Sequence, residues 1–379
     1  MPEYTQITLA SPKQRYLLDL QKDGFNYDAS QEIAVNLLES LYVRLLKNDG
    51  AGFRKGFLAK LIKRLATPRA SNLIQGLYFW GGVGRGKTYL MDAFYESLPF
   101  NEKMRLHFHR FMRRVHVELK FLQGKKDPLN IIAENIAGEA RVICFDEFFV
   151  SDIADAMLLG KLFELLFSKN VILVATSNVE PDNLYLNGLQ RQRFLPAIEI
   201  LKQNTKIVNV DGGVDYRLRS LEQAELYYCP LGFAADQALM EAFKVFSSSA
   251  SGAENNVGLD IEGRQIQCRH LGKDVVWFDF DVICSAPRSQ NDYIELSREF
   301  HAVLISGVSA MGQKNEDQAR RFINLVDEFY DRNVKLVLSA EIGLGSLYEN
   351  GILSFEFRRT KSRLLEMQSH EYLARPHQP

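Results

Sequence analysis

The sequence predicts an α/β fold in which helices flank a parallel sheet, followed by a mixed α/β region. Three observations predict the sheet. An apolar stretch, residues 76–80, runs into a glycine-rich turn and then into a helical pattern. A second, residues 141–145, ends in two acids, and a third, residues 171–175, ends in small polar residues. Short apolar runs of this kind are typical of buried parallel strands, whose carboxyl ends share one sheet edge.

Composition indicates an ordinary globular protein, because 46% of the 379 residues are hydrophobic and 25% are charged. At this length we expect one large domain or two modest ones. The formal net charge of −1 argues against a basic surface for nucleic acid. Residues 1–20 have no signal-peptide pattern, no C-x-x-C spacing occurs, and no run approaches the roughly 18 apolar residues that cross a bilayer. We therefore expect a cytoplasmic protein.

Residues 1–70 are expected to form a helical N-terminal extension. Apolar residues recur at helical spacing over residues 12–47, and Asp28 is interpreted as an N-cap with Gln31 as its reciprocal glutamine. Residues 51–70 contain six Lys or Arg and no acid. We expect the apolar face of this basic helix, with Leu61 and Ile62, to dock on the protein's own α/β domain, and membrane contact is the alternative.

The glycine-rich turn after residue 80 matches the phosphate-binding pattern G-x-x-x-x-G-K-[ST]. Such a loop points successive N–H groups at one spot, and the next helix adds its positive dipole end. Lys87 is expected to reach the β- and γ-phosphates, and the hydroxyl of Thr88 to bind Mg²⁺. The residues expected to contact the nucleotide are Gly81, Gly82, Val83, Gly84, Arg85, Gly86, Lys87 and Thr88. The sequence therefore predicts that ATP or a similar triphosphate binds here.

Asp146 and Glu147 follow the second predicted strand and would meet the glycine-rich loop at the same sheet edge. Asp146 is expected to hold Mg²⁺ through its water shell, whereas Glu147 would orient and deprotonate the attacking water. A kinase does not need the second acid, since its acceptor is a substrate hydroxyl. The pair therefore favours hydrolysis.

Asn178 closes the third predicted strand. In ATPases with an additional strand the equivalent Asn helps to place the attacking water, and a plain strand-end turn is the alternative here. Arg191 and Arg193 follow at a spacing suited to reaching the γ-phosphate of a neighbouring subunit. Surface salt bridges are the competing interpretation. We take Arg191 as the candidate finger and Arg193 as the runner-up, which requires an oligomer.

The stretch 103–126 is basic and is interpreted as a solvated face. Within it, residues 104–109 alternate like a strand, which would bring His107 and His109 to one face. No third donor joins them, so we assign no histidine metal site.

Several longer motifs resemble the ZapE cell-division ATPases and their mitochondrial AFG-like (lactation-elevated) relatives. The most discriminating runs are His107-Phe108-His109-Arg110-Phe111-Met112 and Asp152-Ile153-Ala154-Asp155-Ala156-Met157. Matching runs continue to Glu366-Met367, so the resemblance covers nearly the whole chain. The family tends to have Gln-Val-Thr where this chain has Phe149-Val150-Ser151, which puts a polar role at position 149 in doubt.

The resemblance implies a Mg-dependent ATP hydrolase with an AAA+-type P-loop NTPase fold that remodels or regulates a protein partner. In bacteria this family is associated with the division ring and its tubulin-like GTPase, and in mitochondria with quality control of membrane proteins. We expect a homo-oligomer, with peripheral contact to the inner membrane at the division site as one alternative for its location. Two rival functions stay open: a DNA-associated ATPase such as a helicase loader, and a nucleotide-switched scaffold with negligible turnover.

The chain is expected to divide into residues 1–70, an ATPase core at 71–220 and a lid-like mixed α/β region at 221–379. In the last region we predict a flexible loop near 247–256, three strands and three helices. The strands are expected at 275–280, 301–305 and 335–339, and the first two helices at 291–300 and 316–332. Arg363 on the final helix is a candidate for reaching ATP, and a solvated position is the alternative.

Overall fold

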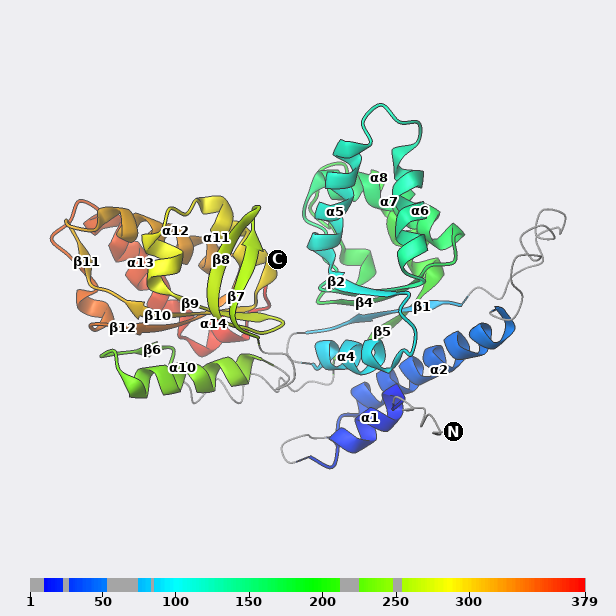
Figure 1. The fold of residues 1–379 in the computed structure, drawn as a ribbon, viewed down its shortest axis with the longest axis horizontal. Coiled ribbons are helices and arrows are strands. Elements are labelled where there is room, and N and C mark those ends of the chain that lie inside the picture. The colour runs from blue at the N-terminus through cyan, green and yellow to red at the C-terminus, as the bar shows by residue number, and fades with distance from the viewer. Residues whose placement is uncertain are drawn as a thin grey trace, which may run out of the picture. The chain divides into compact units, whose positions relative to one another are not determined.

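The computed structural model describes residues 10–22, 27–52, 74–82, 85–211, 225–247 and 254–378, without the side chains of 48–52. The chain folds into two compact units, Met1–Val214 and Asp215–Pro379. Each is described by itself (Figure 1). The predicted basic helix with Leu61 and Ile62 lies outside the described residues, and so do Val83 and Gly84 of the glycine-rich loop.

The first unit is built on a parallel sheet with the strand order β2-β3-β4-β1-β5. Its strands are β1 (Gly76–Trp80), β2 (Lys103–His107), β3 (Val142–Asp146), β4 (Ile172–Ser177) and β5 (Thr205–Asn209). All residues of β3 and β4 are buried, as their apolar sequences predict. Because β4 lies between β1 and β3, the glycine-rich turn, the two acids and the small polar residues at the ends of these strands share one edge. This confirms the α/β fold with a parallel sheet.

Helices cover both faces of this sheet (Figure 1). On one face lie α5 (Phe108–Phe121), α6 (Pro128–Glu139), α7 (Ile153–Ser168) and α8 (Arg191–Asn204). On the other lie α1 (Pro12–Asp19), α2 (Ala29–Gly52) and α4 (Lys87–Ser97). Alternate residues of β1 point to opposite faces of the sheet. Tyr78 packs in the core beneath α5–α8, whereas Leu77 and Phe79 pack in the core beneath α1, α2 and α4. The N-terminal helices therefore pack directly on the helix that follows the glycine-rich loop.

Helix α2 is fastened to that loop through Gln31. Asp28 caps the helix as predicted, since its Oδ1 accepts hydrogen bonds from the N–H groups of Ser30 at 2.7 Å and Gln31 at 3.2 Å. The prediction that the Gln31 side chain completes the cap by bonding back to the start of the helix is wrong. Its Nε2 donates instead to the carbonyl oxygen of Arg85 at 3.2 Å, and the side chain packs against Gly86. Gln31 is buried there, with 5% of its surface exposed.

The second unit contains a six-stranded sheet with the order β6-β12-β10-β9-β8-β7. Its strands are β6 (Tyr227–Tyr228), β7 (Glu254–Ile261), β8 (Arg264–Leu271), β9 (Val275–Asp279), β10 (Ala302–Val308) and β12 (Lys335–Ala340), and β11 (Met311–Gly312) pairs separately with β13 (Tyr348–Glu349). Strands β6, β9, β10 and β12 are parallel, and β7 and β8 are antiparallel additions. The mixed α/β character expected for this region is confirmed.

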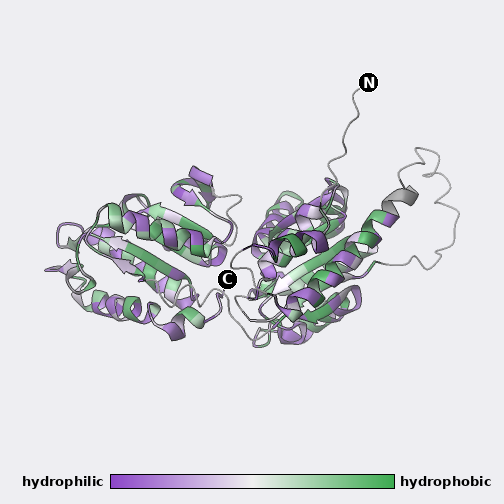
Figure 2. Cartoon of the chain, turned by 90° about the horizontal axis from the view of Figure 1, so that it is seen from below, coloured by the Kyte–Doolittle hydropathy of each residue, from purple (hydrophilic) through white to green (hydrophobic). Residues whose placement is uncertain are grey.

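Helices also cover both faces of the second sheet. On one face lie α11 (Gln290–Glu299), α12 (Glu316–Asp331) and α13 (Ser354–Met367), and on the other lies α10 (Phe233–Phe246). Shorter elements are α14 (His370–Ala374), η1 (Pro181–Asn183), η2 (Asp281–Ser285) and η3 (Leu344–Ser346). Figure 2 shows apolar strands inside each unit between helices of mixed hydropathy. None of the helices in the described part of the chain is long and apolar enough to cross a membrane.

Two details differ from the sequence-based expectations. Glu254–Asn256, placed in a flexible loop, belong to strand β7, and residues 248–253 lie outside the described part. Strand β2 ends at His107, so His109 lies on helix α5 instead of alternating along a strand.

Gly76 is required where β1 passes β4. A methyl group added at Gly76 would overlap the carbonyl oxygen of Leu173, whereas one added at Gly138, on the exposed side of α6, would meet nothing within 4 Å. We expect Gly76→Ala to lower the free energy of unfolding by about 1–3 kcal/mol, as overpacking does. Gly138→Ala is the matched control and should raise it by up to about 1 kcal/mol. Urea unfolding of both variants measures this, and equal stabilities would contradict the close approach of the strands.

Candidate active site

The glycine-rich loop connects β1 to α4 and is shaped around the side chain of Lys87. Gly86 has φ +74°, a left-handed conformation that glycine adopts without strain. Lys87 begins α4, and its Nζ donates to the carbonyl oxygens of Gly81 at 2.7 Å and Gly82 at 2.6 Å. The ammonium group is therefore held over the backbone of the loop, beside the positive end of the helix dipole.

Arg85 anchors the described part of the loop to the rest of the sheet. Its Nε lies 2.9 Å from the Oδ1 of Asp211, just after strand β5. Val210 donates its N–H to the carbonyl oxygen of Trp80 at 2.8 Å, which fixes the same segment beside the end of β1. Together with the bond from Gln31 to the Arg85 carbonyl, these contacts support the loop from two sides.

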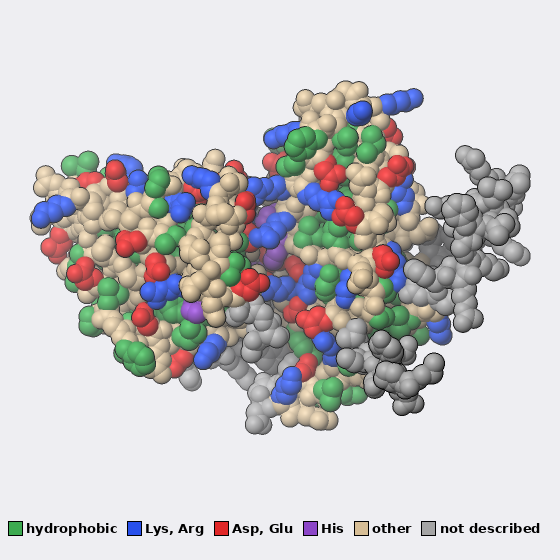
Figure 3. Space-filling view, viewed as in Figure 1, with side chains coloured by type: hydrophobic (Ala, Val, Ile, Leu, Met, Phe, Trp, Pro, Cys, Tyr) green, Lys and Arg blue, Asp and Glu red, His purple; other side chains and the backbone are tan. Residues whose placement is uncertain are grey.

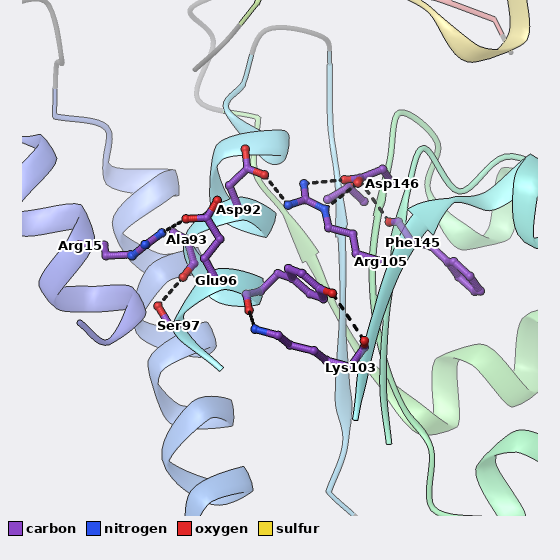
Figure 4. Close-up of polar contacts among 11 residues, drawn as sticks. Arg15, Asp92, Ala93, Glu96, Ser97, Lys103, Arg105, Phe145 and Asp146 are labelled. Carbon is purple, nitrogen blue, oxygen red and sulfur yellow. Dashed lines mark hydrogen bonds and ion pairs between the residues drawn. The ribbon is translucent and has the colours of Figure 1, made fainter. Parts of the chain in front are cut away.

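Asp146 ends strand β3 and is held by an arginine from the neighbouring strand. It is buried, with 4% of its surface exposed. Arg105 on β2 donates from Nε to Oδ2 at 2.8 Å and from Nη2 to Oδ1 at 3.2 Å. The same guanidinium bonds through Nη1 to Asp92 on α4 (Figure 4). Although burial by itself lowers it, the pKa of Arg105 is raised above its ordinary value by Asp146 and Asp92, so the group stays cationic.

Glu147 follows Asp146 in a backbone conformation that is rare for its residue type. Its φ is +52°, and a left-handed non-glycine residue costs on the order of 1–3 kcal/mol. The end of β4 holds this turn in place: Glu147 donates its N–H to the Oγ1 of Thr176 at 3.3 Å, and Phe148 donates to the Thr176 carbonyl at 2.7 Å. The Nδ1 of His107 lies 3.9 Å from the Glu147 carboxylate. Strain held in this way is typical of functional residues.

Asn178 lies immediately after β4, where Ser177 pairs in register with Trp80, the residue before the glycine-rich loop. The loop, the two acids and Asn178 therefore follow the ends of adjacent strands β1, β3 and β4 at one edge.

Arg191 and Arg193 lie at the start of α8, which packs on the face of the sheet opposite α4. The half-buried Arg191 donates from Nη2 to the carbonyl oxygen of Asp182 at 2.5 Å, whereas Arg193 is exposed. In the second unit, Arg363 forms ion pairs with Asp327 and Asp331 and lies over the ring of Tyr330. Its guanidinium is thus engaged within its own unit.

The basic stretch 103–126 is not one solvated face. That interpretation is wrong for Arg105, which lies between two carboxylates with only 11% of its side chain exposed. Arg114 pairs with Glu118 and Glu139, and His116 lies 2.6 Å from the Oδ1 of Asp155 on α7. Figure 3 shows Lys and Arg interspersed with Asp and Glu over the surface of each unit.

The oxygen donors at this edge fit a magnesium ion. Thr88 supplies a hydroxyl in the first turn of α4, and Asp146 supplies a carboxylate at the end of β3. Hydroxyl, carboxylate and water oxygens are the ligands that Mg²⁺ prefers beside substrate phosphates.

Comparison with known proteins extends over nearly the whole chain. The family model described as "AFG1-like ATPase" matches residues 10–376. The chain is 49% identical to "Cell division protein ZapE" of Escherichia coli K12 over 371 residues, 97% of this chain and 98% of that protein. It is 36% identical to "Lactation elevated protein 1 homolog B" of Danio rerio over 342 residues, 79% of this chain and 68% of that protein.

Solved structures resemble parts of the chain more weakly. The crystal structure of DnaI has 19% sequence identity and a TM-score of 0.35, and the match covers 57% of this chain and 94% of that one. A likeness of this size carries no argument about function.

Proposed function

The chain belongs to the AFG1-like ATPase family, and we propose that it uses Mg²⁺-dependent ATP hydrolysis to remodel or regulate a protein partner in cell division. Membership of the family makes the chain an ATP hydrolase with a P-loop NTPase fold, and it confirms the resemblance found in the motifs. The role in cell division rests on the 49% identity to the E. coli division protein over nearly its full length.

One observation carries the assignment of the hydrolytic residues: Glu147 sits in a strained turn beside Asp146 at the end of β3, and only β4 separates β3 from β1, the strand that leads into the phosphate loop. We assign Lys87 to the β- and γ-phosphates and Glu147 to the proton of the attacking water, which Asn178 helps to orient. Gly81, Gly82, Arg85 and Gly86 surround the phosphates through their backbone. Thr88 and Asp146 would hold Mg²⁺, which when bound withdraws charge from the phosphate oxygens.

We further propose that catalysis uses an arginine from a neighbouring subunit. Arg191 begins α8, on the sheet face opposite α4, and the proposal requires that another copy presents its phosphate site to this arginine. Arg191 would then give up its hydrogen bond to the Asp182 carbonyl oxygen and bind the γ-phosphate of the neighbouring subunit. Desolvated between subunits, the guanidinium would stabilise the charge that develops on the transferring phosphoryl group.

Arg191→Ala is therefore expected to bind ATP nearly normally and to hydrolyse it slower by on the order of 10³-fold. Steady-state phosphate release over a range of protein concentrations measures this. Mixing Arg191→Ala with Lys87→Ala should restore some activity, because a mixed interface pairs an intact pocket with an intact finger. Arg193→Ala is tested in the same way, since Arg193 is the exposed alternative. Unimpaired variants at both positions, or activity per subunit that is independent of concentration, would rule out a shared site.

For the partner, we propose the tubulin-like division GTPase or other division-ring components, met in the cytoplasm, with peripheral contact to the inner membrane as the alternative. A capture experiment tests this with Glu147→Gln in ATP and with Lys87→Ala as the nucleotide-free control. Purified tubulin-like GTPase should be retained by the first and not by the second. Equal retention by both variants would contradict a nucleotide-controlled partner. Salt-sensitive retention of DNA in place of the GTPase would favour the DNA-associated alternative.

A further inference from the structure

We propose that Arg105 is a positioning residue that joins the phosphate-loop helix to the end of strand β3 and weakens the affinity of the site for Mg²⁺. The proposal rests on the role proposed for Asp146 and concerns how the protein prepares that carboxylate. Arg105 is not part of the glycine-rich loop or of the acid pair.

The position of Arg105 between two elements of the site is the first support. Strand β2 pairs in parallel with β3, and the Arg105 side chain reaches from the middle of β2 to the end of β3. Its opposite side bonds to Asp92, which lies on α4 five residues after Lys87. Figure 4 shows the guanidinium between the two carboxylates. One side chain therefore joins the phosphate-loop helix to the metal-binding strand end.

The geometry fixes the Asp146 carboxylate in one orientation. Two parallel N–H···O bonds to a planar guanidinium hold both carboxylate oxygens, which a lysine at this position could not do. A carboxylate oxygen has two lone pairs, so a bond to Arg105 and a contact to a water molecule in the shell of a metal ion can use different ones. Arg105 thus sets the direction from which Asp146 approaches the ion.

The charges explain why Arg105 also opposes the ion. Asp92, Asp146 and Arg105 together carry one net negative charge in a largely buried place. Removing the arginine takes the shared cation away from Asp146, which is buried, and from Asp92, whose side chain is 25% exposed, and this is destabilising. A divalent cation would then replace the missing positive charge, so Mg²⁺ should bind more tightly. Removing the charge of Asp92 should instead weaken Mg²⁺ binding, because the positive charge of Arg105 is then shared with Asp146 alone.

The test measures the binding of a fluorescent nucleotide, mant-ADP, as a function of MgCl₂ concentration. Arg105→Gln should lower the half-saturating Mg²⁺ concentration by about tenfold or more, because a unit positive charge a few ångströms away repels a divalent ion. Asp92→Asn should raise it. Because Asp92→Asn removes only one partner of the arginine, it keeps the proposal testable if Arg105→Gln fails to fold.

Thermal unfolding without nucleotide, in EDTA and in MgCl₂, is the second readout. Arg105→Gln should melt below wild type in EDTA, and MgCl₂ should raise its melting temperature more than that of wild type. Arg114→Gln is the matched control, because Arg114 also bridges two carboxylates, Glu118 and Glu139, on helices remote from the loop. It should lose stability equally in both buffers.

Shifts of the Mg²⁺ midpoint in the same direction for Arg105→Gln and Asp92→Asn, or no shift in either, would overturn the proposal. The Lys87 and Glu147 variants report separately on the proposed hydrolytic function. If those behave as expected while the Mg²⁺ midpoints do not move, only the role of Arg105 falls.

Discussion

Replacing Lys87 by alanine is expected to abolish ATP binding and, with it, hydrolysis. The ammonium group lies within 2.7 Å of the carbonyl oxygens of Gly81 and Gly82, where the loop would receive the phosphates. Its loss removes the cation that faces the β- and γ-phosphates. We expect the affinity for mant-ATP, measured by fluorescence anisotropy, to fall by on the order of 100-fold or more, since charge-assisted hydrogen bonds are worth about 1.5–3 kcal/mol each.

Lys161→Ala provides the control for a lost lysine in the same unit. Lys161 is exposed on α7 and pairs with Glu164, an exposed ion pair that contributes little. This variant should bind mant-ATP as wild type does. If Lys87→Ala also binds mant-ATP with the wild-type affinity, the glycine-rich loop is not the phosphate site.

Replacing Glu147 by glutamine is expected to leave ATP binding intact and to suppress hydrolysis. Glutamine has the same size and accepts the same turn, so the backbone that Thr176 holds is kept, whereas the group that takes the proton from water is lost. General bases contribute roughly 10²–10⁴-fold, and the steady-state rate of phosphate release should fall by that order. Hydrolysis at the wild-type rate would show that another group activates the water.

Local sequence was sufficient to predict the sheet and its functional edge. Strands β1, β3 and β4 are each short and largely apolar, and each is followed by a distinctive segment: a glycine-rich turn, an acid pair or small polar residues. All three are buried and adjacent in the structure, because a parallel strand covered on both faces must be apolar along its whole length. The phosphate loop carries its signal in consecutive residues, so no tertiary information was needed to find it.

The partners of Arg105 and Gln31 could not be predicted in the same way. Arg105 lies 41 residues from Asp146, and Gln31 lies 54 residues from Arg85, so both bonds depend on how strands and helices pack. In the sequence, Arg105 belongs to a basic run and Gln31 has the spacing of a capping residue, and both local explanations are physically sound. Burial is the information that the sequence lacked.

The β7–β8 hairpin could have been predicted from the sequence. Glu262-Gly263 separates two alternating stretches, and both residues have positive φ, +50° and +74°. Two consecutive residues with positive φ are typical of the tight turns that join antiparallel strands, and glycine at the second position favours such a turn. The expected flexible loop at 247–256 overlaps the first residues of β7, Glu254–Asn256.

The central claim is that one site binds ATP through the glycine-rich loop and hydrolyses it with Glu147. The most direct test identifies the nucleotide that stays bound to Glu147→Gln after incubation with ATP and Mg²⁺ and rapid gel filtration. Wild type treated in the same way should retain ADP, whereas the variant should retain intact ATP. Recovery of ADP from the variant, in the same proportion as from wild type, would contradict the claim.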